Sequence, residues 1–192
     1  MLCGLPGSGK STLAKRLVAA SSSSGGGGSG GPEERGSSKQ KGEVCWVRAS
    51  QDDDGKEQAR EIVIDFCKNK WHDTQQQLVL DMCNLDAEVR GKWMALMRDA
   101  QPAIARAGAG AAKKGKGDQI VALHLDVPGD VCKQRLKIRS QAGDHPTIKG
   151  DGSRIVDAFV KTGTAPVVSE GFAQVLAVRS EDEVDEIATR LL

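Results

Sequence analysis

The residues best suited to chemistry stand at the start of the chain, where residues 4–11 read GLPGSGKS. The glycines at positions 4, 7 and 9 let the backbone curve closely around a phosphate and turn its N–H groups inward. Lys10 can then reach the β- and γ-phosphates, and the Ser11 hydroxyl can ligate Mg²⁺. The stretch therefore predicts a nucleoside triphosphate site. Its predicted binding residues are Gly4, Pro6, Gly7, Ser8, Gly9, Lys10, Ser11 and Thr12.

The spacing fits G-x-x-x-x-G-K-[ST] at every fixed position, which is the P-loop pattern. This pattern is shared by kinases, GTPases and motor ATPases, so it does not choose among them. The guanine-reading N-K-x-D of a switch GTPase is absent from the sequence, and motor ATPases normally need more chain than these 192 residues for their oligomer contacts. A small P-loop kinase that uses ATP and Mg²⁺ is the class that remains.

Carboxylates follow two of the expected strands. SQDDDG at residues 50–55 comes after the strand expected at 44–48, and Asp81 lies in the strand expected at 77–82. In an open parallel sheet, ligands bind beyond the carboxyl ends of the strands, so these groups should meet the P-loop at one edge. We expect Asp52 to accept the proton of an acceptor hydroxyl and Asp81 to organise the Mg²⁺ shell. The neighbouring aspartates, Asp53 and Asp54, are expected to be solvated or helix-capping groups.

Basic residues mark the helix expected at 129–139. Arg135 and Arg139 lie one turn apart, so one face of this helix can present both guanidinium groups to the P-loop. Kinases commonly clamp the transferred phosphoryl group with arginines on a mobile lid. We expect Arg135 or Arg139 to be this lid arginine, and an exposed basic face is the alternative interpretation.

Strands and helices alternate along the chain. Besides the two strands above, strands are expected at 119–127 and 174–178. Helices are expected at 11–20, 56–70 and 89–104, and after the capping box Ser180-x-x-Glu183. This alternation predicts an α/β P-loop NTPase fold, a doubly wound parallel sheet of about five strands with helices on both faces. Only Met1–Cys3 precede the P-loop, a strand of ~10 Å, and we therefore expect the natural chain to begin upstream.

The whole of 1–192 is expected to be one kinase domain with two low-complexity inserts, Ser/Gly-rich at 21–42 and Gly/Ala/Lys-rich at 107–117. The net charge of +1 and 3% aromatic content argue against a broad basic field or a base-stacking platform. No apolar run approaches the ~18 residues of a membrane helix. The 5 cysteines have no metal-binding spacing. We expect free thiols and a soluble intracellular monomer, nuclear or cytoplasmic.

Three further stretches carry a family resemblance. Together with GLPGSGKST, the stretches SQDDDG and LVLDMCNLDAEVRGKW resemble the P-loop polynucleotide kinases. The stretch TAPVVSEGFAQVLAV is similar to the segment that closes the kinase domain of bifunctional polynucleotide kinase/phosphatases. The likeness is greatest to the kinase-like domain of plant-type aprataxin-like DNA repair proteins, and this repair resemblance slightly favours the nucleus.

The resemblance implies a role for each matching position. Asp52 takes the place of the general base, and Gln51 precedes it where some members have Arg. Asp81 matches the carboxylate that ends the third strand, while Asn84 and Asp86 fall in the substrate-side block. The resemblance further implies that Lys10 and Ser11 hold the nucleotide and the metal, and that the lid arginine is Arg135 or Arg139.

One position departs from the family pattern. Phage-type members carry an arginine three residues after the base to grip the acceptor phosphate, and Gly55 stands there in this chain. Neither a D-x-D-x-[TV] phosphatase block nor an H-x-H-x-H motif occurs in the sequence. The leading hypothesis is an ATP-dependent kinase for the 5′-hydroxyl of DNA or RNA. The alternatives are a small-metabolite P-loop kinase and a nucleotide-dependent module that binds nucleic-acid ends with little catalysis.

Overall fold

The computed structural model describes residues 1–22, 44–69, 76–101, 119–142 and 152–191. The insert expected at 107–117 lies outside the described residues. Of the insert expected at 21–42, only residues 21 and 22 are described, and they extend the first helix beyond its expected end.

The described residues contain five strands, all of which pair in parallel, as predicted. They pair as a three-stranded sheet in the order β1-β4-β5 and a two-stranded sheet of β2 and β3. Gly4 at the end of β1 donates its N–H to the carbonyl of Cys83 just after β3 (2.9 Å), which joins the two sheets. The strands are β1 (Leu2–Gly4), β2 (Cys45–Ser50), β3 (Gln76–Asp81), β4 (Val121–Leu125) and β5 (Gln174–Val178).

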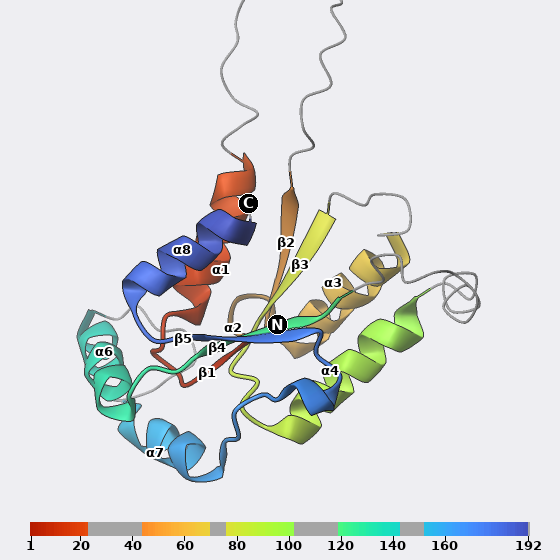
Figure 1. The fold of residues 1–192 in the computed structure, drawn as a ribbon. Helices are drawn as coiled ribbons and strands as arrows, with labels where there is room; N and C mark the ends of the chain where they lie inside the picture. Colours follow the sequence, from red (N-terminus) through yellow and green to blue (C-terminus); the bar gives the residue numbers. More distant parts are fainter. Residues whose placement is uncertain (23–43, 70–75, 102–118, 143–151, 192) are drawn as a thin grey trace, which may run out of the picture.

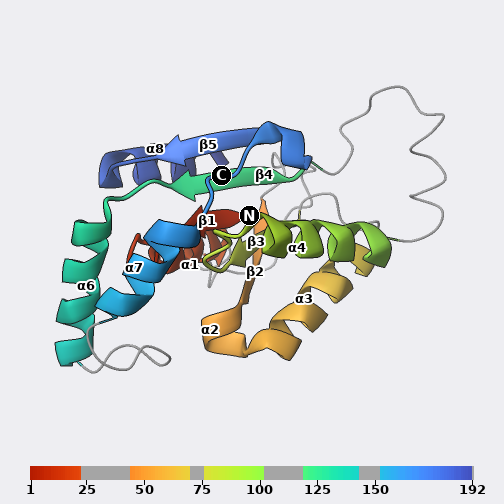
Figure 2. The same ribbon diagram turned by 90° about the horizontal axis from the view of Figure 1, so that it is seen from below.

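Helices flank the strands on both sides (Figure 1). On one side lie α1 (Lys10–Ser22) and α8 (Glu181–Leu191), and on the other α3 (Lys56–Asn69) and α4 (Ala87–Ala100). At one end of the strands, α6 (Gly129–Ala142) lies beside α7 (Ser153–Thr162) (Figures 1 and 2). The sequence patterns did not predict α7, the short helix α2 (Gln51–Asp54) or the 3₁₀ turn Val168–Glu170.

The two faces of the strands have separate cores because successive strand side chains point to opposite faces. Val79 packs with residues of β1, α1 and α8, including Leu2 and Leu17. The next residue, Leu80, packs with Ala59 and Val63 of α3. This alternation within β3 is what allows helices to cover both faces, as the fold class requires.

Side-chain caps fix where two helices begin. The hydroxyl of Ser180 accepts the N–H of Glu183 (3.2 Å) ahead of α8, as the predicted capping box requires. The carboxylate of Glu183 accepts the N–H of Arg179 (2.6 Å). Asp86 caps α4. Among the described helices, none is long and apolar enough to cross a membrane.

Candidate active site

The P-loop connects β1 to α1 and curves tightly against its surroundings. Gly7 has φ +84, and a Cβ at this position would lie 2.7 Å from the carbonyl oxygen of Cys132 on α6. A Cβ at Gly4 would lie 2.8 Å from the carbonyl oxygen of Leu125 and 2.9 Å from the hydroxyl of Ser8. Glycine is required here both by the backbone angle and by the close approach of β4 and α6.

Lys10 is buried inside this loop. Its ammonium group donates hydrogen bonds to the carbonyl oxygens of Gly4 (2.9 Å) and Leu5 (2.8 Å). The hydroxyl of Ser8 is buried and has no hydrogen-bond partner among the described residues. A buried donor without a partner and a lysine held within a glycine-rich loop fit a bound phosphate, whose oxygens would accept from both groups.

The strand ends place the predicted carboxylates together. Ser50 at the end of β2 lies opposite Asp81 at the end of β3. Asp81 is buried, and its Oδ2 accepts hydrogen bonds from Nε (3.0 Å) and Nη2 (2.5 Å) of Arg48. The same guanidinium donates to Asp53 (2.6 Å), which lowers the pKa of the Asp53 carboxyl. Arg48 therefore neutralises negative charge of Asp53 and Asp81 at the ends of β2 and β3. The sequence patterns did not single out this arginine.

Asp52 is exposed on α2, which begins directly after β2. The buried hydroxyl of Ser50 caps this helix. The backbone N–H of Ser50 donates to the carboxylate of Asp54 (2.8 Å). These contacts confirm a capping role for Asp54. They orient the short helix at the edge where Asp81 ends β3.

Cys83 follows β3, and its carbonyl accepts the N–H of Gly4 in the P-loop. Burial raises the pKa of its thiol, the nearby ammonium of Lys10 opposes this shift, and the carboxylates of Asp52 and Asp81 add to it. The charges of the P-loop lysine, the predicted base and the predicted metal-organising carboxylate therefore all affect the pKa of this thiol. All five cysteines are free thiols, as the sequence predicted.

The expected lid arginines reach the mouth of the P-loop. A cavity of about 310 Å³ is lined by Ser8, Gly9, Thr12, Arg16, Arg135, Ile138, Arg139 and Val184. A second cavity of about 130 Å³ also contains Ser8 and Arg135, together with residues of the β4 and β5 ends. Arg135 therefore lies beside the P-loop in both cavities, whereas Arg139 lines only the larger one. Arg16 of α1 is a third guanidinium at this opening, and its ion pair with Asp185 links α1 to α8.

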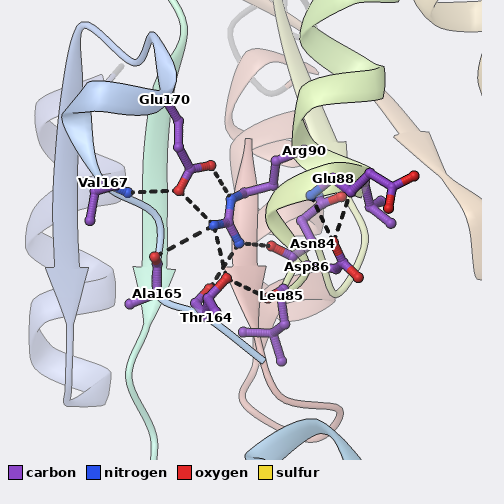
Figure 3. Close-up of polar contacts among 10 residues, drawn as sticks. Asn84, Leu85, Asp86, Glu88, Arg90, Thr164, Ala165, Val167 and Glu170 are labelled. Carbon is purple, nitrogen blue, oxygen red and sulfur yellow. Dashed lines mark hydrogen bonds and ion pairs between the residues drawn. The ribbon is translucent and has the colours of Figure 1, made fainter. Parts of the chain in front are cut away.

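A buried arginine organises the segments that carry the family resemblance (Figure 3). The side chain of Arg90 on α4 is 0% exposed and pairs with Glu170, Nε to Oε2 and Nη2 to Oε1, each at 2.7 Å. It also donates to the carbonyls of Asn84 (3.0 Å) and Thr164 (2.8 Å). The sequence patterns did not single out Arg90, because its partners Glu170 and Thr164 lie far along the chain.

The residues of the substrate-side block have structural partners in this network. Asp86 caps α4 by accepting the N–H of Glu88 (2.7 Å). Asn84 has a left-handed φ of +46° and donates its side-chain amide to the carbonyl of Leu2 (2.8 Å). Both side chains therefore fix the turn between β3 and α4.

The remaining predicted residues lie in or next to the P-loop. Pro6 is buried, Ser11 is half-buried at the start of α1, and Thr12 is exposed at the larger cavity. No group of three or more His, Cys, Asp or Glu side chains among the described residues could hold a metal ion by itself. Hard oxygen donors, such as the Ser11 hydroxyl and the Asp81 carboxylate, fit Mg²⁺ when phosphate oxygens complete its shell.

Comparisons with known proteins identify a family for most of the chain. A search of the curated proteins found no match. Among solved structures, the chain is similar to the APS kinase CysC of Mycobacterium tuberculosis in complex with AMPPNP and APS. The identity is 16%, the match covers 99% of this chain and 92% of that chain, and the TM-score is 0.47. A family model described as an AAA domain matches residues 1–153. The chain belongs to this AAA domain family. It has the P-loop NTPase fold predicted from its sequence, with parallel strands between helices.

Proposed function

We propose that this protein is a kinase that transfers the γ-phosphoryl group of a nucleoside triphosphate, ATP in the first instance, to a hydroxyl group of an acceptor. The observation that carries the proposal is the meeting of the P-loop with the ends of β2 and β3. Gly4 of the P-loop donates its N–H to the carbonyl of Cys83, two residues after Asp81. Asp81 lies opposite Ser50, which caps the helix that carries Asp52. A phosphate-binding lysine and an exposed carboxylate at the same strand edge are the parts that such a transfer needs.

The chemistry assigns one role to each group. The acceptor hydroxyl oxygen forms a bond to the γ-phosphorus, and the bond between this phosphorus and the β,γ-bridging oxygen breaks. Asp52 accepts the hydroxyl proton, and the nucleoside diphosphate leaves with the bond's electron pair. Lys10 and an arginine of α6 stabilise the charge on the transferred group. Ser11 and Asp81 would hold Mg²⁺, which when bound neutralises charge on the phosphate oxygens.

The charges around α2 favour a small acceptor over a polyanion. Asp52, Asp53 and Asp54 are all exposed there. The nearby guanidinium of Arg48 is already engaged by two carboxylates, and glycine stands at position 55. A nucleic-acid backbone would be repelled by such an edge, since its affinity depends on cations that neutralise phosphates. A small hydroxylated metabolite is therefore the leading acceptor class.

A second candidate acceptor is the 5′-hydroxyl of DNA or RNA. One specific observation favours it: Arg90 of the LDMCNLDAEVR block forms a buried ion pair with Glu170 of the PVVSEGF block. These two blocks carry the resemblance to polynucleotide kinases and to aprataxin-like repair proteins, and the structure of this chain joins them directly.

The test is a transfer assay with γ-labelled ATP, Mg²⁺, and two sets of acceptors. One set is a panel of sugars, nucleosides and other small alcohols, and the other is DNA and RNA oligonucleotides with 5′-hydroxyl ends. We expect label on a small acceptor, and we expect Asp52→Asn to lower kcat by about 100-fold or more, since general-base catalysis contributes about this much.

The matched control is Asp53→Asn, which changes the neighbouring carboxylate on the same helix. Asp53 pairs with Arg48, so this variant should lose some stability and keep most of its kcat. Label on oligonucleotides alone would favour the second candidate. Nucleotide binding without label on any acceptor would contradict catalysis and favour an end-binding module.

A further inference from the structure

The two halves of the proposed site stand on different sheets. The P-loop follows β1, which pairs with β4, whereas Asp52 and Asp81 follow β2 and β3, which pair with each other. Among the described residues, no strand ladder joins β3 to β1. The alignment of donor and acceptor groups therefore depends on side-chain packing, such as that of Leu2 with Val79, and on the hydrogen-bond contacts between β1 and the residues that follow β3.

These contacts, which we call the seam, comprise two hydrogen bonds. Gly4 donates its N–H to the carbonyl of Cys83 (2.9 Å), and Asn84 donates its side-chain amide to the carbonyl of Leu2 (2.8 Å). Both bonds depend on the conformation of residues 83 and 84. Asn84 adopts φ +46°, a left-handed conformation that asparagine tolerates better than most residues but that still needs support.

Arg90 of α4 supports this conformation of Asn84 (Figure 3). Its Nη1 donates to the carbonyl of Asn84 (3.0 Å) and to that of Thr164 (2.8 Å). Its Nε and Nη2 bond both carboxylate oxygens of Glu170, and Nη2 also reaches the hydroxyl of Thr164 (3.3 Å). Every N–H of the guanidinium thus has an acceptor, and the side chain is fully buried. Such a planar fork holds its partners in a single arrangement that an ammonium group cannot reproduce.

The opposite side of the fork is equally fixed. Glu170 accepts the N–H of Val167 (3.2 Å), and Thr164 donates its N–H to the carbonyl of Leu85 (2.7 Å). The segment from Thr164 to Glu170 is therefore bonded to the turn that follows Asn84. Arg90 lies between two anchored segments and cannot shift without moving the turn.

We propose that Arg90 is a positioning residue, which together with Glu170 fixes the seam and so sets the alignment of the P-loop with the carboxylates of β2 and β3. This inference rests on the proposed function. Residues 5–9 of the P-loop lie between β1 and α1, and Lys10 is held within the loop by the carbonyls of Gly4 and Leu5. Of the two seam bonds, one reaches the P-loop, through the N–H of Gly4. Loosening the seam should therefore leave nucleotide affinity unchanged and lower kcat, because a misalignment of about 1 Å can cost ~100-fold in rate.

The experiment compares two variants with the wild type. Arg90→Lys keeps the positive charge beside Glu170 and removes the fork. The double variant Arg90→Met with Glu170→Met removes both charges, a replacement that often preserves the stability of a buried pair. The matched control is Val63→Ala, which leaves a cavity where α3 packs on Ala49 and Leu80 and keeps both hydrogen bonds of the seam. Each protein is measured for Tm, the Kd of a fluorescent ATP analogue, kcat, and hydrogen exchange of the Gly4 amide.

We expect both Arg90 variants to bind the analogue with wild-type Kd, to lose at least ~10-fold in kcat, and to exchange the Gly4 amide faster. Val63→Ala should lower Tm with wild-type kcat and Gly4 exchange. Wild-type kcat and wild-type Gly4 exchange in the double variant would overturn the proposal. If the wild type transfers no phosphate, the proposed function fails, and Gly4 exchange then decides alone: faster exchange in Arg90→Lys supports the seam role, and unchanged exchange overturns it.

Discussion

Arg48 on β2 donates from both Nε and Nη2 to a single oxygen of Asp81 at the end of β3. The side chain of Asp81 is 2% exposed, so its charge depends on this guanidinium. Arg48→Met would leave a buried carboxylate without its partner, and we expect the free energy of unfolding in urea to fall by about 3 kcal/mol. Adding Asp81→Leu should recover most of this loss. A single variant as stable as the wild type would contradict the importance of the pair.

Asp86 offers a test of structure against substrate binding. It caps α4 by accepting the N–H groups of Glu88 and Val89, although the family resemblance places it in the substrate-side block. We expect Asp86→Ala to cost about 1 kcal/mol of stability and Asp86→Asn much less, because both Asp and Asn are good N-caps. The KM for the acceptor should stay at its wild-type value in both variants. A KM that rises equally in both variants would show that the carboxylate contacts the acceptor.

Acid should destabilise the fold through Glu170. The hydrogen bonds from Arg90 hold the pKa of its carboxyl below the ordinary value of 4.5. Because the folded pKa is the lower one, the contribution of Glu170 to stability is complete above pH 4.5 and is lost as the pH falls through the folded pKa. The stability difference between the wild type and Glu170→Gln should therefore shrink between about pH 5 and about pH 3 in urea titrations. A difference that stays constant over this range would refute the assignment.

Two glycines with similar φ form a matched pair. Gly7 (φ +84°) and Gly55 (φ +80°) both have a positive φ, but a Cβ at Gly7 would strike the carbonyl of Cys132, whereas nothing lies within 4 Å at Gly55. Gly55→Ala should cost only the backbone strain of φ 80° with ψ 162°, about 1–3 kcal/mol. Gly7→Ala should cost more and should also weaken binding of the ATP analogue. If Gly7→Ala and Gly55→Ala changed Tm and Kd equally, α6 would have to move away from the added Cβ at little cost.

Substitutions of the two lid arginines should have different effects on kcat and on the KM for ATP. Arg135 lines both cavities beside Ser8, whereas Arg139 lines only the larger one with Thr12 and Arg16. We expect Arg135→Met to lower kcat by about 100-fold, as removal of a transition-state donor does. Arg139→Met should mainly raise the KM for ATP. The opposite pattern in steady-state assays would exchange the two roles.

Most of the fold was predictable because the helices and strands have clear periodicity. The strand at 174–178 was predicted with its observed bounds, and the helix predicted at 56–70 is observed over its described part, Lys56–Asn69. By contrast, α7 was missed. Its apolar residues Ile155, Val156, Phe159 and Val160 recur at helical spacing, so the amphipathic pattern was present in the sequence and could have predicted this helix.

The site was only partly predictable, because the spacing of residues in a sequence indicates which chemistry they could perform but not which distant side chains pair with each other. The glycines and Lys10 follow a local pattern that needs no knowledge of tertiary contacts. Arg48 and Arg90, however, acquire their roles from partners far along the chain, Asp81 and Glu170. No local pattern distinguishes these arginines from solvent-exposed ones, since only the packing of β2, β3 and α4 buries their side chains.

Lys10 already has two carbonyl partners within its own loop. A phosphate that enters the loop must therefore take the ammonium group from these carbonyls, so the contact with Lys10 exchanges hydrogen bonds rather than adding them. A new hydrogen bond comes instead from the buried hydroxyl of Ser8, which has no partner among the described residues. Because the ammonium group already lies inside the loop, little ordering of the Lys10 side chain accompanies nucleotide binding.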